Sequence, residues 1–227
     1  MTFQFGNFGG INRAHSAPSR PFYFNFVKRG ADVLLSLTAL ICLSPFLLLI
    51  AILIKLDSRG PVIFRQRRNG CGGRTFTIIK FRTMANQPDA VFKQCEAEDQ
   101  RVTSIGRYLR KFYLDELPQL LNVLHGDMSI VGPRPHALEH DQQFAAYFPN
   151  YMKRYSVRPG LTGWAQILGR NGPATTVESM AARLDADFEY IRRRSFALDM
   201  LIILRTLPAI LSIWNANWLF RRQIGPD

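Results

Sequence analysis

The sequence predicts a mainly helical α+β protein that one apolar helix attaches to a membrane. Three observations lead to this class. The run from Val33 to Leu56 contains a single charge, at Lys55. Around Gly70 to Gly73, β-branched and aromatic residues alternate with cations, which predicts one short hairpin, and much of the remaining chain has helical periodicity. A chain of 227 residues suits one compact unit with an appendage.

The apolar run has 24 residues and would be about 36 Å long as a straight helix, enough to cross a hydrocarbon core of about 30 Å. Two features favour a helix that re-enters instead. Pro45 follows Ser44 at the midpoint and predicts a kink because proline has no N–H. Cations flank both ends, with Lys28 and Arg29 before the run and Arg59 after it, and both flanks prefer the cytoplasm. The pattern leaves spanning and re-entrant helices open.

The hairpin is expected to pair strands over 62–67 and 75–81. Helices are expected over 103–111, 116–124, 185–194 and 199–220. The last of these is apolar but interrupted by Arg205, Pro208 and Asn215, so we expect it to lie along a membrane interface.

The chain is strongly basic, with 29 Lys+Arg against 17 Asp+Glu and a formal net charge of +12. Such a balance favours nucleic acid, acidic lipid headgroups or phosphorylated small molecules as partners. Nucleic acid is the weakest of these, because no nucleic-acid-binding motif is present. The three cysteines have no zinc-site spacing, which fits a reducing setting.

Two adjacent carboxylates, Asp115 and Glu116, lie between cations that include Arg110 and the rigid turn Gly132–Pro135. One reading is structural: Asp115 caps a helix whose first turn contains Pro118. The other reading is chemical. Fixed cations would neutralise phosphoryl oxygens and allow one carboxylate to attack a phosphate, while the second carboxylate could hold Mg²⁺.

Four motifs resemble the bacterial sugar transferase family, the monotopic phosphoglycosyl transferases. The likeness covers roughly Phe26 to Leu211, and the motifs occur in the family's order and spacing. They are Lys80-Phe81-Arg82-Thr83-Met84, Leu114-Asp115-Glu116-Leu117-Pro118-Gln119, Gly126-Asp127-Met128-Ser129 running into Gly132-Pro133-Arg134-Pro135, and Arg158-Pro159-Gly160-Leu161-Thr162-Gly163-Trp164-Ala165-Gln166.

The resemblance implies transfer of a sugar-1-phosphate from a UDP-sugar to undecaprenyl phosphate, with release of UMP. This would be the first step of exopolysaccharide, capsule or O-antigen assembly. Asp115 would be the nucleophile that forms a covalent phosphoglycosyl-aspartate, and Glu116 would bind Mg²⁺. The side chains implied to hold substrate phosphates are Arg110 and Arg134, with Lys80, Arg82 and Arg158 as further members.

The resemblance also implies a re-entrant helix broken at Ser44 and Pro45, on the cytoplasmic face of a bacterial inner membrane. The chain would then divide into a loose N-terminal arm (1–27), the re-entrant helix and its flanks (28–59), a cytoplasmic catalytic domain (60–198) and an interfacial helix with a tail (199–227). Membrane lipids and a second copy of the chain are candidate partners.

The donor sugar is predicted from Thr176-Val177-Glu178-Ser179-Met180, which resembles members that transfer glucose-1-phosphate. The chain differs from that subgroup at Arg170-Asn171 and Gly172-Pro173-Ala174, so UDP-galactose or an N-acetylated UDP-hexose stays open. A different class of function is a non-catalytic module that holds anionic lipid. That alternative does not explain two carboxylates inside a cation cluster.

Overall fold

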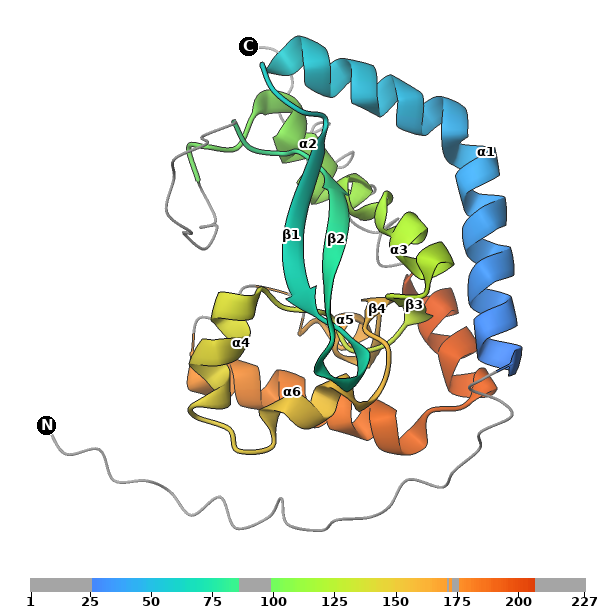
Figure 1. Cartoon of the computed structure of the whole chain (residues 1–227), viewed down its shortest axis with the longest axis vertical. Coiled ribbons are helices and arrows are strands. Elements are labelled where there is room, and N and C mark those ends of the chain that lie inside the picture. Colours follow the sequence, from blue (N-terminus) through green and yellow to red (C-terminus); the bar gives the residue numbers. More distant parts are fainter. Residues whose placement is uncertain (1–25, 86–98, 171, 173–175, 207–227) are drawn as a thin grey trace, which may run out of the picture.

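The described part of the protein is mainly helical, with two small two-stranded sheets (Figure 1). The computed structural model describes residues 26–85, 99–170, 172 and 176–206. In chain order the elements are α1 (Lys28–Asp57), β1 (Ile63–Asn69), the 3₁₀ turn η2 (Cys71–Gly73), β2 (Thr75–Phe81), α2 (Ser104–Lys111), η3 (Leu114–Glu116), α3 (Gln119–His125), β3 (Ser129–Val131), α4 (Leu138–Ala145), η4 (Tyr151–Ser156), β4 (Gly160–Thr162), α5 (Trp164–Ile167) and α6 (Val177–Arg193). A further helix covers residues 196–206. The predicted α+β class is confirmed.

Among the described residues, α1 is the one helix long and apolar enough to cross a membrane. Pro45 lies inside it, and the missing N–H of proline leaves the Ile41 carbonyl without its usual helix bond. The Ser44 hydroxyl donates to that carbonyl at 2.8 Å. Figure 1 shows the two arms of α1 running in different directions. The helix therefore continues through the Ser-Pro pair but changes direction.

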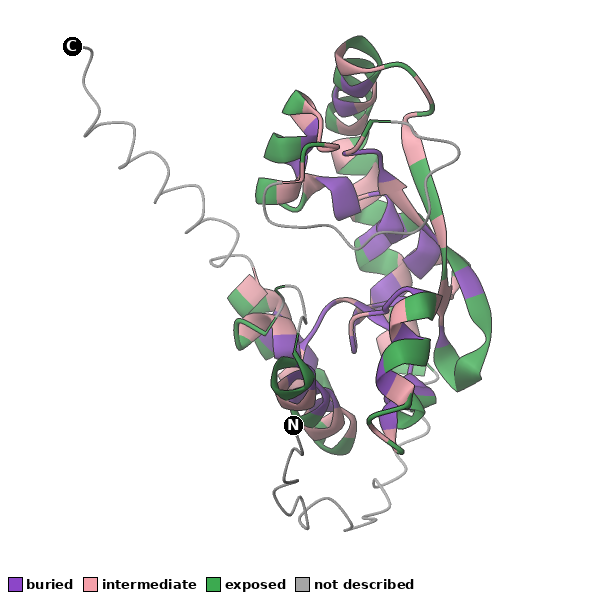
Figure 2. Cartoon of the chain, turned by 90° about the vertical axis from the view of Figure 1, so that its left-hand side faces the viewer, coloured by how far each residue is buried: buried purple, intermediate pink, exposed green. Residues whose placement is uncertain are grey.

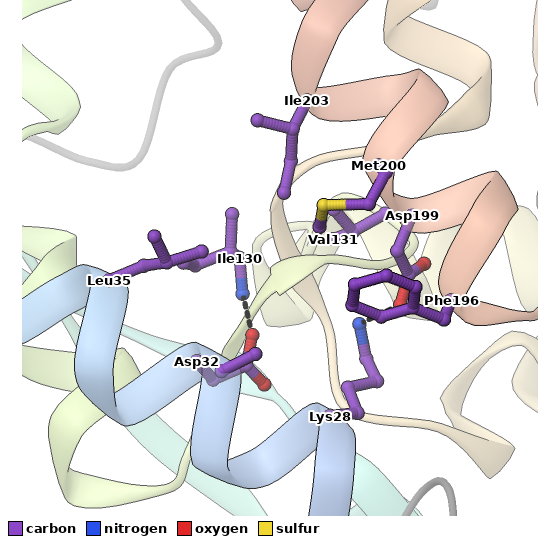
Figure 3. A pocket seen from close by; sticks show the side chains of 10 residues that line it. Lys28, Asp32, Leu35, Ile130, Val131, Phe196, Asp199, Met200 and Ile203 are labelled. Atoms are coloured by element: carbon purple, nitrogen blue, oxygen red, sulfur yellow. Dashed lines mark hydrogen bonds and ion pairs between the residues drawn. The ribbon is translucent and has the colours of Figure 1, made fainter.

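Polar contacts join the first arm of α1 to the rest of the chain. The buried Asp32 carboxylate accepts hydrogen bonds from the Ser129 hydroxyl at 3.1 Å and from the Ile130 amide at 3.0 Å. Lys28 pairs with Asp199 at 2.8 Å. Figure 3 shows Lys28, Asp32, Ile130 and Asp199 in a pocket between α1, β3 and helix 196–206, whose other lining side chains are apolar. The contacts tie α1 to strand β3.

Apolar contacts join the second arm to the same domain. Ile50 and Ile54 are buried in one cluster with Phe81 of β2 and Leu109 of α2. Both arms of α1 therefore pack against one folded unit, and α1 wraps around it in Figure 1.

The predicted hairpin is confirmed as an antiparallel pair of β1 and β2. Its register runs from Ile63 opposite Phe81 to Asn69 opposite Thr75, so the first strand ends two residues later than expected. In β2, Phe76 and Ile78 are buried while Thr75 and Thr77 are exposed, as expected for a strand segment with one face on a core, and Phe81 is buried on the opposite face. Through β2, the hairpin packs against α1 and α2 in one apolar cluster and against α3 in another.

A second sheet was not predicted. Strands β3 and β4 are parallel, with Ser129 opposite Gly160 and Val131 opposite Thr162. The two backbones lie so close that a Cβ on Gly160 would be 2.1 Å from the Gly132 nitrogen, so only glycine fits at position 160. Each strand has three residues, too short for an alternating pattern to be recognised.

The predicted helices are present with shifted ends. α2 agrees within one residue of its predicted start, whereas α6 begins at Val177, eight residues before the expected 185. The reason is a capping box in which the side chains of Thr176 and Ser179 bond each other's backbone. Helix 196–206 begins three residues before the expected 199. The remainder of the predicted segment 199–220, and the predicted arm up to residue 25, lie outside the described residues.

Among the described residues, buried apolar side chains form four clusters. Figure 2 marks all buried residues, polar ones included, in purple. One cluster lies under α1, α2 and β2, and another between β2 and α3. The other two lie around α4, η4 and α6, and around β3, α6 and helix 196–206. The core is thus divided, and polar groups occupy the regions between its parts.

Candidate active site

Three elements bring Glu116 together with two cations. Glu116 lies in η3, Lys80 in β2 and Arg134 in the turn after β3. The Lys80 ammonium is 2.6 Å from Glu116 Oε1. The Arg134 guanidinium donates to Oε2 at 2.9 Å and also to Oε1. Glu116 is therefore held by a two-pronged arginine contact and a lysine, an arrangement that fixes the carboxylate in position.

The carboxylates lie in a short turn before α3. Tyr113, just ahead of η3, has a φ of 55° and is the one non-glycine residue with positive φ in the described chain. Its left-handed backbone turns the chain after α2. α3 itself begins at Gln119, and its cap position is Pro118, without a side-chain capping bond. The reading of Asp115 as a helix cap is therefore wrong.

Asp115 differs from its neighbour because its carboxylate accepts no hydrogen bond within the described part of the chain. Its exposed fraction is 9%. Burial raises the pKa of Asp115 to about 6; Lys80 opposes this shift, and the charge of Glu116 adds to it. The side chain is thus a buried carboxylate that lies near cations but makes no ion pair with them in the described part of the chain.

Glu116 has the opposite electrostatic character. Burial alone would raise its pKa, but Arg134 and Lys80 together hold the pKa below its usual range. In return, Glu116 raises the pKa of Arg134. Burial lowers the pKa of Lys80. Glu116 therefore stays ionised while Asp115 titrates closer to neutrality.

Three of the five predicted phosphate-binding cations lie around the carboxylates. Lys80 and Arg134 contact Glu116 directly. Arg110 is close enough to lower the pKa of Asp115, and its Nε donates to the Thr83 hydroxyl at 2.7 Å.

The other two predicted cations bond elsewhere. Arg82 donates to the carbonyls of Ser58 at 2.7 Å and Arg59 at 2.8 Å, where it satisfies the end of α1. Arg158 donates to the Gly126 carbonyl at 3.0 Å. These bonds give Arg82 and Arg158 structural partners, and their role toward phosphate stays a prediction.

The turn Gly132–Pro135 that carries Arg134 is held through carbonyl groups. Its two prolines have no N–H to donate. The carbonyls of its last three residues accept, in chain order, from the Gly160 amide at 2.9 Å, the Arg154 guanidinium at 2.8 Å and the Arg68 guanidinium at 3.1 Å. No sequence pattern indicated that Arg68 or Arg154 holds this turn.

Behind this turn lies a second set of buried polar residues, which we call the Arg154 cluster. Arg154 is 0% exposed and pairs with Asp187 at 2.6 Å. Burial lowers the pKa of His136, so the neutral ring can accept from Arg154 at Nδ1, 2.6 Å away. The members of the Arg154 cluster are His136, Asp141, Tyr151, Arg154, Tyr155 and Asp187. They come from four separate segments and form no contiguous sequence motif, so the sequence did not indicate that they meet.

The donor set at the carboxylates fits a magnesium ion. Glu116 offers an oxygen ligand, because its Oε2 keeps a lone pair beyond the bond to Arg134. Magnesium commonly takes one or two carboxylates and fills its remaining positions with water and substrate phosphate. The described residues contain no group of three or more His, Cys, Asp or Glu placed to hold a metal, so substrate and water would complete the shell.

The fold and the carboxylates held among cations define a protein built for phosphate chemistry beside an apolar helix. Residues 23–213 match the model of the bacterial sugar transferase family. The chain belongs to this family, as its motifs predicted.

Similar proteins carry three kinds of name. A UDP-glucose:undecaprenyl-phosphate glucose-1-phosphate transferase of Caulobacter vibrioides is 50% identical over 83% of this chain and 71% of its own length. A UDP-N-acetylgalactosamine-undecaprenyl-phosphate N-acetylgalactosaminephosphotransferase of Aeromonas hydrophila is 43% identical over 91% of this chain and 48% of its own length. The exopolysaccharide production protein PSS of Rhizobium leguminosarum is 44% identical over 80% of this chain and 93% of its own length. The chain spans 43% and 39% of two further relatives that carry the glucose-1-phosphate transferase name.

Proposed function

We propose that the protein transfers glucose-1-phosphate from UDP-glucose to undecaprenyl phosphate and releases UMP, as the first step in assembling an exopolysaccharide, capsule or O-antigen. The observation that carries this proposal is the difference between the two carboxylates. Glu116 is paired with Lys80 and Arg134, whereas Asp115 is buried beside the same cations without a hydrogen bond. Such a pair suits one fixed anion and one attacking anion.

In the first step an Asp115 oxygen attacks the β-phosphorus of the donor. A bond forms between that oxygen and phosphorus, and the bond from phosphorus to the bridging oxygen breaks. UMP leaves with the electron pair, and the sugar phosphate stays on Asp115 as a mixed anhydride. Arg110, Arg134 and Lys80 offset the charge of the phosphoryl oxygens during the attack.

In the second step a phosphate oxygen of undecaprenyl phosphate attacks the same phosphorus. The bond to Asp115 breaks, the carboxylate regains its electron pair, and undecaprenyl diphosphate glucose is released. Each half-reaction exchanges one phosphoryl bond for another, so no water or redox partner is needed.

Mg²⁺ is part of this proposal, with Glu116 as its protein ligand. When bound, it would offset the charge of the diphosphate and of departing UMP.

Glucose is the proposed sugar because relatives at 44–50% identity carry the glucose-1-phosphate transferase name. The Aeromonas relative, with its N-acetylgalactosamine name, is nearly as similar. UDP-N-acetylhexosamines and UDP-galactose are therefore the alternative donors for the same chemistry.

We further propose that α1 enters the membrane, turns at Ser44 and Pro45, and returns to the cytoplasmic face of the inner membrane. The support is that both arms contact one domain: Lys28 pairs with Asp199, and Ile54 packs beside Phe81. A straight helix of 30 residues would separate its ends by about 45 Å, across a bilayer that the domain could not follow.

Cysteine labelling tests this membrane arrangement. In a background without Cys42, Cys71 and Cys95, single cysteines replace the exposed residues Gly30 and Arg59 near the two ends of α1. We expect an impermeant maleimide to label both positions in inside-out vesicles and neither in right-side-out vesicles. Labelling of the two positions from opposite sides would show a spanning helix instead.

Nucleotide release tests the reaction. Purified protein in nanodiscs with Mg²⁺ and undecaprenyl phosphate is given UDP-glucose, UDP-galactose or UDP-N-acetylhexosamines. We expect UMP with UDP-glucose, and a radiolabelled sugar retained on the protein when the acceptor is omitted. Asp115→Asn should abolish both signals, because an amide cannot form the mixed anhydride.

Other outcomes would change the conclusion. Release of UDP in place of UMP would mean transfer of the sugar alone and would exclude an aspartyl phosphate. UMP with another donor would keep the mechanism and change the sugar. Anionic lipid binding that survives Asp115→Asn, without release of any nucleotide, would favour the non-catalytic lipid module.

A further inference from the structure

Arg134 must be aimed accurately, because its two nitrogens contact the two oxygens of Glu116. Such a paired contact depends on both distance and angle. The backbone that carries Arg134 has few donors of its own, since a proline stands on each side of it. The direction of the side chain therefore depends on what holds the carbonyls of this turn.

Arg154 holds the carbonyl of Arg134 itself. One terminal nitrogen of Arg154 donates to the Arg134 carbonyl at 2.8 Å and to Asp187 at 2.6 Å, which uses both of its hydrogens. The other terminal nitrogen bonds His136 at 2.6 Å and Tyr151 at 3.1 Å. Arg154 is thus immobilised by the Arg154 cluster and transmits its position to the turn.

Stability alone does not explain this arrangement. Taking a guanidinium and a carboxylate out of water costs several kcal/mol per ion, and apolar residues of similar volume are often as stable. Arg154 also retains a buried Nε without a hydrogen bond in the described part of the chain, a further cost. A group that is costly to bury and bonds the backbone of a site residue is more readily explained by positioning.

We propose that Arg154 is a positioning residue that fixes the Arg134 main chain and so keeps the Arg134 guanidinium aligned with Glu116. Asp187 and His136 hold Arg154 in turn, so α6 supports the turn that carries Arg134. The kinetic consequence rests on the proposed function, whereas the structural consequence does not.

Hydrogen exchange tests the structural consequence without any turnover. The double variant Arg154→Met with Asp187→Leu removes both buried charges together, so the cluster is not left with an unpaired ion. The Gly132 amide, bonded to the Thr162 carbonyl at 2.9 Å, and the His136 amide report on the turn. We expect both amides to exchange at least about tenfold faster, as local opening becomes easier.

A reporter and a control variant separate positioning from general loosening. The Ile79 amide, bonded to Asn122 at 3.0 Å in another part of the core, should not change. Asn69→Ala removes a different bond to the cluster, to Asp141 at 2.6 Å, and should leave the turn amides unchanged. Unchanged turn amides in the double variant, or equal acceleration at Ile79, would overturn the proposal.

A double-mutant cycle tests the kinetic consequence. We expect Arg154→Met with Asp187→Leu to lower kcat for UMP release by roughly 10- to 100-fold, the size of a misplacement near 1 Å, with a much smaller change in KM. In an Arg134→Ala background the same change should cost less than about twofold, because the group it aims is gone. Additive losses would mean that Arg154 acts independently of Arg134. If the wild-type protein released no UMP, the proposed function would fail, and hydrogen exchange would still decide on the positioning.

Discussion

The carboxylates of η3 and those of the Arg154 cluster are all buried, but they differ in how many hydrogen bonds they accept. In the Arg154 cluster, Asp141 accepts from Asn69, Tyr151 and Tyr155. At the candidate active site Glu116 is equally well held, but Asp115 has no hydrogen bond in the described structure. Carboxylates with several hydrogen bonds hold separate segments together, whereas the Asp115 carboxylate has none of these bonds and the fold stabilises its charge less, which raises its pKa.

The largest effect on stability should come from unpairing the cations of the site. Glu116→Gln leaves Lys80 and Arg134 partly buried without their carboxylate, and removal of one partner from such a pair costs about 3–5 kcal/mol. We expect a correspondingly lower free energy of unfolding, measured with urea on protein in detergent, and loss of UMP release. A loss below about 1 kcal/mol would show that water replaces the carboxylate at the two cations.

Replacement of Asp115 is expected to raise the stability of the protein at neutral pH, whereas replacement of Glu116 lowers it. The pKa of Asp115 is raised from 3.8 to about 6, so the contribution of Asp115 to stability is fully present below pH 4 and is lost as the pH rises toward 6. The loss amounts to about 3 kcal/mol, and Asp115→Asn avoids it. We expect the variant to have the higher Tm at pH 7.5 and no advantage at pH 4. A lower Tm at pH 7.5 would mean that the ionised carboxylate is favoured in the fold.

The pH dependence of the first half-reaction should show the same titration. Only ionised Asp115 can attack, so UMP release should fall about tenfold for each pH unit below 6 and be level above pH 7. The acceptor must be omitted, because a phosphate monoester itself titrates near pH 6. Single-turnover release that is constant from pH 5 to 8 would exclude Asp115 as the titrating group.

The smallest effect is expected in the Arg154 cluster. Asn69→Ala removes one donor to Asp141, which keeps Tyr151 and Tyr155. A single such bond contributes about 1 kcal/mol, so the free energy of unfolding should fall by that amount and kcat should stay unchanged. If the free energy of unfolding fell as much as in Glu116→Gln, the carboxylates of the two regions would not differ in how much single partners stabilise them.

The sequence predicted those features of the fold and the site that depend on residues next to one another in the chain. The hairpin followed from alternation and glycines, α2 from periodicity, and the pairing of Asp115 with Glu116 from adjacency. For Lys80 and Arg134, the sequence predicted only that they belong to a group of cations near the two carboxylates. It did not predict that both contact Glu116. Arg82 shows the limit of that reasoning, because a cation beside the site in sequence bonds the end of α1 instead.

The sequence by itself determined the apolar helix with its Ser-Pro pair, the hairpin and the identity of the acidic pair, since each depends on residues close together in the chain. Tertiary structure decided which carboxylate is paired and which is free. That difference depends on Lys80, 36 residues before Glu116, and on Arg134, 18 residues after it. It also decided that Arg154 supports Arg134, because burial and long-range hydrogen bonds arise only when distant segments pack together.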